Sequence, residues 1–553
     1  MPFEKQPYVA VDARAADCEQ GWLAIFNRLR GVRSVAIECY PGVDEDAIAS
    51  EASAALPDAF LFLTSGARRP ACEVDRLIAP YLTEDPVFGR ICDLTLDQFF
   101  DNGAGPEFLA DRPLVVIGQG ATMFLPNPTI LIYADMPRWE IQQRQRRGDS
   151  AAKDYKRGYF VDWRVADRWK RPLLDRADFL LDTTDRAAPK MITGESFRAA
   201  LAATAHRPFR VVPFFDPGPW GGQWMRRVCG LPDGPPNYAW CFNCVPEENS
   251  LLLGYGDVRV EIPAMDLVLR HPRELLGERV YERFGAEFPI RFDFLDTMDG
   301  GNLSVQVHPL APYAREHFGV AYTQDESYYI LDAGPDASVY LGLKTGVDRD
   351  RMVADLRSDF DADCYLTRWP ARRHDHFSIP AGTIHCAGRN CLVLEISATP
   401  YIFTFKLWDW NRFGLDGKPR PIHLDHGLAN LQWERDTEWV RGNLLTPCEP
   451  VASGESFREE RTGLDRSQFI ETRRHWFRGP VRHSNGATVN VLNLVQGDEI
   501  TVESPSGSFE PMVIHYPETF IVPAAAGDYI IRPSGPSLGT ECATVKAYVR
   551  DCG

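Results

Sequence analysis

Residues 303–309 read LSVQVHP, a short strand-like run with two polar side chains among apolar ones. Successive side chains of a strand point to opposite faces, so Gln306 and His308 share one face while Val305 and Val307 lie on the other. An amide and an imidazole that face the same interior form either a hydrogen-bonded pair or half of a metal site. The flanking sequence has to distinguish the two.

Two further segments carry residues that complete such a site. Glu326 stands at the start of the strand-like run ESYYILDA, and His385 follows Gly382 by three residues in IPAGTIH, residues 379–385. Proline fixes its own backbone angle and glycine permits a sharp reversal. The turn at residues 380–382 can therefore direct His385 back into a barrel.

Together the predicted ligands are two imidazoles, one carboxylate and one amide oxygen. This donor set suits Zn²⁺ or another divalent cation, and it leaves room for water or substrate, as catalytic metal sites do. Each residue taken singly is better explained as an ordinary polar residue of a β protein, but the joint spacing favours a metal site. The four residues are Gln306, His308, Glu326 and His385.

Residues 1–205 alternate short apolar runs with polar, helix-compatible segments, which predicts βα units and a largely parallel sheet. The segment SVAIECYPGVDEDAIAS has the strand, turn and helix of a P-loop kinase. However, it has no G-K-[ST], and its three consecutive acidic residues would repel a polyphosphate. The later YADMPRWEIQQRQRRG resembles the Arg-rich lid segment of small P-loop kinases, although a helix with a basic solvated face explains it equally well. We expect a kinase-like α/β domain without a working nucleotide site.

The residue composition changes near residue 206. The segment FDPGPWGGQW that follows is rich in proline and glycine and predicts a domain boundary. Short strand-like runs punctuated by turn residues follow, which indicates antiparallel barrels. We expect a metal-binding barrel over 206–440, interrupted by a helical insertion near 264–286. Residues 441–553 repeat the β texture more weakly and predict a second, metal-free barrel.

The net charge of −17 argues against nonspecific binding to nucleic acid or to anionic lipid, because both need basic surfaces. The N-terminus has no basic start followed by an apolar run, and no stretch of about 18 apolar residues occurs, so we expect no signal peptide and no membrane span. Thirteen cysteines, an odd number without a regular spacing, predict reduced thiols and a cytoplasmic protein. The sequence does not indicate an oligomeric state.

Seven segments of the sequence resemble one known family. The chain contains, in order, PWGGQW, GNLSVQVHP, DESYYIL, VYLGLK, IPAGTIHCAG, LVLEIS and DWNRFGLDGKPRPIHL. These segments resemble type I phosphomannose isomerases of the cupin superfamily, over about residues 213–425, and the C-terminal block resembles that family's second, metal-free barrel. The resemblance implies an α/β domain followed by two cupin barrels, and zinc held by the four ligands named above.

It also implies reversible conversion of mannose 6-phosphate to fructose 6-phosphate, with a small sugar phosphate as the partner. Aldose–ketose exchange moves a proton between C1 and C2 through an enediol, so it needs a base, a stabilised oxyanion and cations for the phosphate. Lys406 and Glu395 are the candidate catalytic residues. Ser304, Lys344 and Arg412 are the candidate substrate-binding residues. The alternatives are solvated surface charges for the cations and a strand-face Glu paired to an Arg for Glu395.

Two positions depart from the family pattern, which has Lys two residues before the ligand Glu and Arg in the strand after the Glu395 position. Here these are Gln324 and Lys406. Arg and Lys are not interchangeable where bidentate contacts or proton transfer matter. Two other functions therefore stay open: an isomerase or epimerase of a different sugar, and a sugar-binding regulatory protein that kept the metal but lost the base.

Overall fold

The computed structural model describes residues 3–12, 17–101, 103, 105–106, 112–149, 154–398, 403–445, 447–463 and 465–550. Its contacts form two compact units. The N-terminal unit comprises Tyr8–Ala205 and Pro246–Pro272, and the β unit comprises Met1–Pro7, His206–Val245 and Arg273–Gly553.

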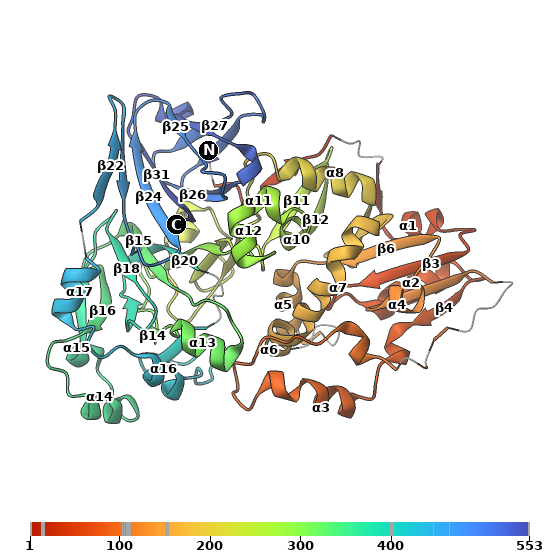
Figure 1. Cartoon of the computed structure of the whole chain (residues 1–553), viewed down its shortest axis with the longest axis horizontal. Coiled ribbons are helices and arrows are strands. Elements are labelled where there is room, and N and C mark those ends of the chain that lie inside the picture. Colours follow the sequence, from red (N-terminus) through yellow and green to blue (C-terminus); the bar gives the residue numbers. More distant parts are fainter. Residues whose placement is uncertain are drawn as a thin grey trace. The chain divides into compact units, whose positions relative to one another are not determined.

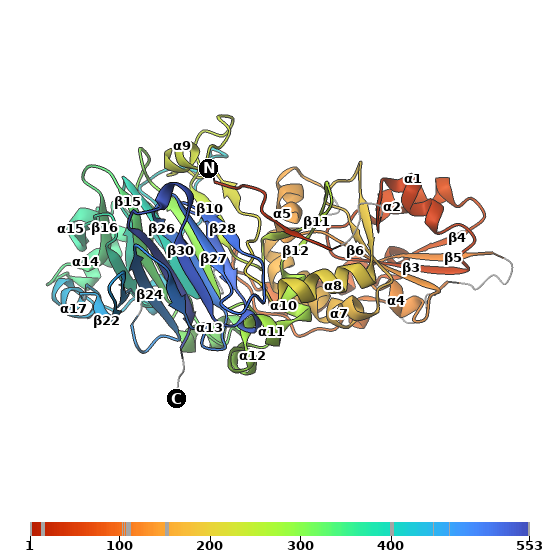
Figure 2. The ribbon, with the colours of Figure 1, turned by 90° about the horizontal axis from the view of Figure 1, so that it is seen from above.

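The N-terminal unit is built on a seven-stranded mixed sheet in the order β2-β8-β7-β6-β3-β5-β4. Strands β4, β5, β3, β6 and β7 run parallel, whereas β8 and β2 join antiparallel. Figure 2 shows α1 and α2 on one face of this sheet and α4, α7 and α8 on the other. Coverage of both faces explains why the inner strands are nearly continuous apolar runs. The strands are β2 (Cys18–Gln20), β3 (Ser34–Cys39), β4 (Phe60–Leu63), β5 (Leu114–Gly118), β6 (Ile130–Asp135), β7 (Phe179–Asp182) and β8 (Lys190–Thr193).

Helices connect these strands, as the alternating pattern of the sequence predicts. They are α1 (Trp22–Arg28), α2 (Glu45–Ala55), α3 (Ala71–Leu82), α4 (Ala121–Phe124), α5 (Arg138–Arg146), α6 (Tyr155–Arg157), α7 (Trp163–Arg176) and α8 (Gly194–Thr204).

A later segment of the chain belongs to this unit. Strand β11 (Ser250–Tyr255) pairs with β12 (Val258–Pro263) and, in parallel, with β1 (Tyr8–Ala10), and helix α10 (Met265–Arg270) follows. From α10, Asp266 forms a buried ion pair with Lys170 of α7, which also pairs with Asp135. The sequence places this segment with the metal-binding domain of 206–440, whereas these contacts join it to the N-terminal unit.

The β unit begins with two antiparallel sheets that face each other, called here the first sandwich (Figure 1). One has the order β18-β15-β20-β13-β10-β9 and the other β17-β16-β19-β14-β21. Strand β20 is buried along its whole length, which places it in the centre of the core. The strands are β9 (Phe214–Asp216), β10 (Trp240–Cys244), β13 (Ile290–Asp296), β14 (Val305–Val307), β15 (Glu326–Ala333), β16 (Ser338–Leu343), β17 (Leu366–Pro370), β18 (His376–Ile379), β19 (His385–Ala387), β20 (Cys391–Ala398) and β21 (Phe405–Trp408).

The C-terminal residues form a second sandwich of two antiparallel sheets, β22-β23-β24-β31-β26-β29 and β25-β30-β27-β28. Side chains of both sheets meet in one apolar cluster that includes Phe477, Leu494, Ile500 and Cys542. The strands are β22 (Glu449–Ser453), β23 (Phe457–Arg461), β24 (Ile470–Phe477), β25 (Val481–His483), β26 (Asn490–Gln496), β27 (Glu499–Glu503), β28 (Met512–His515), β29 (Thr519–Val522), β30 (Tyr529–Pro533) and β31 (Cys542–Val549).

Short helices fill the connections of the β unit. They are α9 (Trp224–Val228), α11 (Pro272–Leu276), α12 (Glu278–Phe284), α13 (Ala311–Phe318), α14 (Arg349–Leu356), α15 (Ala362–Tyr365), α16 (Leu424–Asn430) and α17 (Thr437–Asn443). With α10, helices α11 and α12 make up the helical segment predicted near 264–286. Among the described helices of the whole chain, none is long and apolar enough to cross a membrane.

Candidate metal centre

Strand β14 lies between two strands that carry candidate site residues. Gln306 is directly opposite His385 of β19 on one side and Lys406 of β21 on the other. Opposite residues of an antiparallel pair point to the same face of the sheet. These three side chains therefore share the inner face of the first sandwich, as the alternation in LSVQVHP predicts for Gln306.

The turn before β19 brings the second histidine segment to the first. Gly382 has a φ of +84°, which glycine adopts readily and other residues do not. Its backbone N–H donates to the carbonyl of His308 at 3.0 Å. The glycine thus ties the end of β14 to the segment that carries His385.

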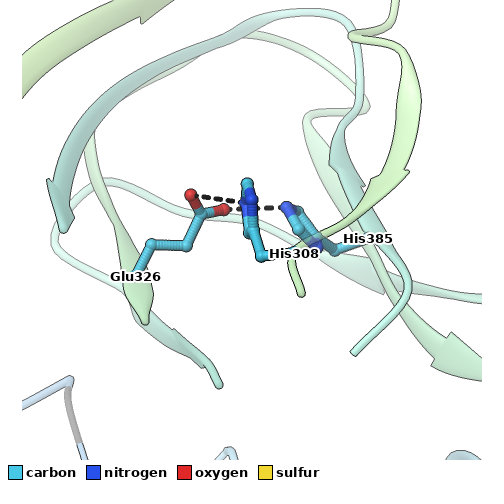
Figure 3. Close-up of side chains that lie close together, drawn as sticks. All are labelled: His308, Glu326 and His385. Carbon is cyan, nitrogen blue, oxygen red and sulfur yellow. Dashed lines mark ion pairs between the residues drawn. The ribbon is translucent and has the colours of Figure 1, made fainter. Parts of the chain in front are cut away.

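Three side chains meet in the interior of the sandwich (Figure 3). His308 Nε2 lies 2.9 Å from Glu326 Oε2, and His385 Nε2 lies 2.7 Å from Glu326 Oε1. One atom from each residue falls within 4.8 Å of the other two, and all three residues are buried. Because Glu326 comes from β15 and His385 from β19, the site joins both sheets.

Backbone carbonyls set the orientation of both imidazole rings. His308 Nδ1 is 3.1 Å from the carbonyl oxygen of Phe403, and His385 Nδ1 is 2.8 Å from that of Thr383. A carbonyl can only accept, so each Nδ1 carries the proton and each Nε2 presents a lone pair to the centre. Metal-bound histidines are commonly held in this way.

The donor set fits a divalent metal ion. His308 Nε2 and Glu326 Oε1 are buried, yet neither has a hydrogen-bond partner in the described part of the chain, as expected of atoms directed at a common ion. Burial by itself raises the pKa of Glu326, but His308 and His385 in their protonated form more than offset this and hold the pKa well below its usual range. A carboxylate with two neutral imidazoles is a donor set that zinc accepts in catalytic sites.

Gln306 lies at the edge of this centre. Its Nε2 is 3.3 Å from His385 Nε2. The amide oxygen and nitrogen of glutamine have nearly the same shape, so a rotation of the amide would turn the oxygen toward the centre. Its assignment as a fourth ligand stays a prediction.

Glu395 is joined to the centre through a glutamine. The Nε2 of Gln324 lies 3.2 Å from Glu326 Oε2 and 3.4 Å from Glu395 Oε1. Glu395 also accepts from Ser397 at 2.9 Å and pairs with Arg291 at 3.2 Å. Burial raises the pKa of Glu395 well above its usual range, although Arg291 opposes the shift. The sequence did not single out Arg291, which lies on β13 opposite Ser397.

A group of cations surrounds Asp409 just after β21. Arg412 donates to Asp409 Oδ1 at 2.6 Å, and Arg420 donates to Oδ2 at 2.7 Å. Ser304 donates to the same carboxylate at 2.9 Å, and Arg420 reaches the Ser304 hydroxyl at 3.0 Å. Burial lowers the pKa of Lys406 to about 8, and Arg420 adds to this lowering. Two arginines for one carboxylate leave an excess of positive charge here.

The predicted site residues therefore separate into groups. His308, Glu326 and His385 meet at one centre, with Gln306 and Lys406 on the same face, and Ser304 and Arg412 share the Asp409 cluster. Lys344 is exposed and its ammonium contacts the carbonyl of Asp363. Arg420 was missed, although the quoted segment DWNRFGLDGKPRPIHL contains it.

The N-terminal unit has a cavity of its own, of about 330 Å³, where β3 and β5 end. The carboxyl ends of parallel strands are the usual binding edge of an open α/β sheet. Here Asp44 caps helix α2 through the N–H of Ala47, and Glu45 accepts from the N–H of Gln119. Carboxylates thus occupy the helix N-terminus at which a phosphate would bind.

Two arginines of the predicted Arg-rich segment are buried in the interior of this unit. Arg138 donates to Asp167 at 2.5 Å, and Arg144 donates to the carbonyl of Thr183 at 2.8 Å. Both guanidinium side chains are at least 96% buried, so they hold the fold together and do not face solvent.

The comparisons with known proteins give a match to one family model and several homologous proteins. A family model described as a domain of unknown function, DUF8485, matches residues 21–206. The chain is distantly homologous to mannose-6-phosphate isomerases. It is 29% identical to the mannose-6-phosphate isomerase of Streptococcus mutans over 216 residues, which is 38% of this chain and 64% of that protein. It is 32% identical to mannose-6-phosphate isomerase ManA of Bacillus subtilis over 162 residues, 29% of this chain and 49% of that protein. The chain thus spans about half to two thirds of these relatives' length.

The fold of a solved structure also matches. The crystal structure of the mannose 6-phosphate isomerase from Bacillus subtilis superimposes with a TM-score of 0.51 and 19% identity, covering 62% of this chain and all of the other. The antiparallel sheets that follow the mixed parallel sheet therefore have the fold of that enzyme.

Proposed function

We propose that this protein is a metal-dependent sugar-phosphate isomerase that interconverts mannose 6-phosphate and fructose 6-phosphate. The observation that carries the proposal is the buried centre of His308, Glu326 and His385, whose donor atoms lie within 4.8 Å of one another. The homology to mannose-6-phosphate isomerases supports the substrate class.

In this proposal the three residues hold a zinc or similar ion, with Gln306 as a fourth ligand. Such an ion acts as a Lewis acid toward a substrate carbonyl and its neighbouring hydroxyl. The chain's own residues then have separate tasks. The carbonyls of Phe403 and Thr383 keep the imidazoles in the tautomer that binds metal, and burial of the site excludes competing water.

Lys406 is the proposed carrier of the proton between C1 and C2. It lies on the same sheet face as Gln306 and His385, so its ammonium can reach a sugar bound over the centre. Its lowered pKa of about 8 is near the range in which one group can both accept and return a proton. Glu395, paired with Arg291, is proposed to orient the substrate or the ligand Glu326 through Gln324.

The Asp409 cluster is proposed to hold the phosphate. Arg412 and Arg420 supply guanidinium donors that match phosphate geometry, and Ser304 adds a hydroxyl. We further propose that the two sandwiches are cupin barrels, and that the N-terminal unit is a kinase-like domain without a nucleotide site. The carboxylates of Asp44 and Glu45 at the start of α2 support the last point.

One observation favours a second candidate, a protein that binds sugar without isomerising it or that acts on another sugar. Gln324 bridges Glu326 and Glu395 with a neutral amide at the position where the resembled family has a lysine. A neutral amide cannot take part in proton transfer as an amine can.

The test is isomerisation of mannose 6-phosphate in deuterated water, comparing zinc-loaded with chelator-stripped protein. Metal-dependent formation of fructose 6-phosphate with deuterium at C1 or C2 is expected. Absence of product and of exchange, in protein that carries one bound zinc per chain, would contradict the proposal and favour the second candidate. A screen of other sugars and sugar phosphates for metal-dependent proton exchange would then separate a different isomerase from a binding protein.

A further inference from the structure

The interior of the second sandwich changes from apolar to charged side chains along its length. In β24 and β31, Phe477 lies opposite Cys542, and both belong to the apolar cluster. Toward the other end of the same inner face, Arg473 lies opposite Lys546, and Glu471 lies opposite Tyr548. A core needed only for stability would continue with apolar residues, because buried polar groups add cost without partners.

This polar end opens into a cavity of about 550 Å³, a volume within the usual range for small-molecule sites. Five cationic side chains line it together with one carboxylate, that of Glu471. The cations are Arg279, Arg461, Arg466, Lys546 and Arg550.

Two carboxylates near the cavity are each shared by several cations. Glu471 is shared by Arg461 at 3.3 Å and Arg550 at 3.4 Å, and Arg473 also contacts it. Glu449 is shared by Arg461 at 3.0 Å and Arg466 at 2.5 Å. Each of these two acidic groups thus serves at least two guanidinium groups, and the lining of the cavity has five cationic side chains against one carboxylate.

Among the five cations that line the cavity, Lys546 gives the clearest indication that an anion binds there. It is 7% exposed, and within the described residues its ammonium makes no direct ion pair, although Glu459 and Glu471 act on it through longer-range charge. Its nearest aromatic contact is the ring of Tyr548, 5.3 Å away. A buried lysine normally has a paired anion. Because Lys546 lines the cavity, an anion bound there would supply the acceptor that the chain does not.

A hydroxyl in the same cavity has no partner either. Thr488 is 1% exposed, and its Oγ1 makes no hydrogen bond in the described part of the structure. Deeper in the sandwich, both ring nitrogens of His483 and the Oγ1 of Thr544 are also buried without a partner. Most buried polar atoms in folded proteins are satisfied, so this concentration marks a place where another molecule binds.

We propose that this cavity of the second sandwich binds a phosphate-bearing small molecule, with Lys546 as its buried anchor. The arginine side chains at the rim present planar donor pairs that match phosphate oxygens, and Lys546 supplies a point charge below them. The site is separate from the His308–Glu326–His385 centre and does not depend on the isomerase function.

The test is calorimetric titration of the full-length, metal-loaded protein at pH 7 with inorganic phosphate and, separately, with glucose 6-phosphate. Lys546→Met is expected to weaken the binding at this cavity by at least about tenfold, as for loss of a charged hydrogen bond. Thr488→Val is expected to weaken it by about twofold to tenfold. Arg482→Gln, which removes an exposed cation paired with Asp528 elsewhere on the same sandwich, is expected to leave it unchanged.

Arg420→Gln distinguishes phosphate binding at the Asp409 cluster from binding at this cavity. This variant is expected to leave the Lys546-dependent binding intact. Tighter Lys546-dependent binding of glucose 6-phosphate than of inorganic phosphate would identify an organic phosphate as the ligand. Comparable affinities would identify phosphate itself. If both Thr488→Val and a folded Lys546→Met protein bound both ligands with wild-type affinity and stoichiometry, the proposal would be overturned. Absence of binding heat from the wild-type protein would overturn it equally.

Discussion

At the scale of single residues, the centre combines a strong acceptor with two oriented lone pairs. Glu326 is the only charged member, and it faces both Nε2 atoms. Removing its charge while keeping its shape therefore tests the metal site directly.

Glu326→Gln is expected to lower the affinity for zinc by at least about tenfold, because it removes the one anionic ligand. The bound metal is measured by mass spectrometry after dialysis at fixed free zinc. Glu438→Gln is the matched control, since that carboxylate is 69% exposed and pairs with Arg441. Equal zinc content in the two variants would contradict the assignment of the site.

Lys546 provides a pH-dependent prediction about stability. Burial lowers its pKa from 10.5 to about 8, while Glu459 partly opposes the shift. The protonated form is thus disfavoured in the folded state. This cost is fully present below about pH 8 and disappears as the pH rises toward 10.5.

Lys546→Met is therefore expected to raise the free energy of unfolding at pH 7, by up to about 3 kcal/mol for a shift of this size. The gain should shrink at pH 9.5. Thermal unfolding in phosphate-free buffer measures it, with Lys418→Met, an exposed lysine, as the control. A lower melting temperature for Lys546→Met at pH 7 would show that the ammonium stabilises the fold.

At the scale of elements, the turn at residues 380–382 decides whether the two histidine segments meet. Gly382 needs a positive φ, and a Cβ there would lie 2.8 Å from Gln432 Cγ and 3.0 Å from the carbonyl oxygen of Asn430. The turn is thus constrained both by its own backbone and by the chain packed against it.

Gly382→Ala is expected to destabilise the β unit by about 1–3 kcal/mol and to weaken zinc binding, because the strained turn no longer holds the His385 segment against His308. Gly346→Ala is the matched control. Gly346 has a similar φ of +82°, but a Cβ there meets nothing within 4 Å. Loss of stability in both variants, with zinc affinity lowered only in Gly382→Ala, is the expected result. Unchanged zinc affinity in Gly382→Ala would mean that the turn does not position the site.

At the scale of the whole molecule, two units are built from interleaved stretches of chain. The segment Pro246–Pro272 returns to the N-terminal unit, where Asp266 joins the buried pair of Lys170 and Asp135. These three side chains are at most 1% exposed, so one ammonium faces two carboxylates away from water, and burial raises the pKa of Asp266 well above its usual range.

Asp266→Ala is expected to destabilise the N-terminal unit by about 1–3 kcal/mol, because Lys170 loses one of its two buried partners and keeps the other, Asp135. Scanning calorimetry should show the unfolding of this unit at a lower temperature, with zinc binding by the β unit retained. Asp175→Ala, which removes a 65% exposed partner of Arg270, serves as the control. If only the unfolding temperature of the metal-binding β unit fell, the segment would belong to the β unit instead.

Local sequence patterns predict the strand around Gln306, the largely parallel N-terminal sheet and a set of candidate metal-binding side chains. Strand alternation places Gln306 on one face, and the Pro-x-Gly turn before His385 is visible from residue chemistry alone. Both are local properties, because side-chain periodicity and backbone preference depend on neighbours along the chain. The alternating βα pattern of the first 205 residues likewise predicts a largely parallel sheet, whereas the antiparallel pairing of β8 and β2 is seen only in the structure.

Tertiary structure alone decided which distant groups meet. Arg291 becomes the partner of Glu395, and Arg420 joins Arg412 on Asp409, through pairing of strands and loops that no local pattern encodes. The return of residues 246–272 to the first unit rests on contacts with distant segments, among them the buried pair of Asp266 with Lys170, the parallel pairing of β11 with β1 and the bond from the N–H of Glu261 to Asp182. The cationic cavity of the second sandwich arises in the same way, because charges from separate strands gather only when the sheets close.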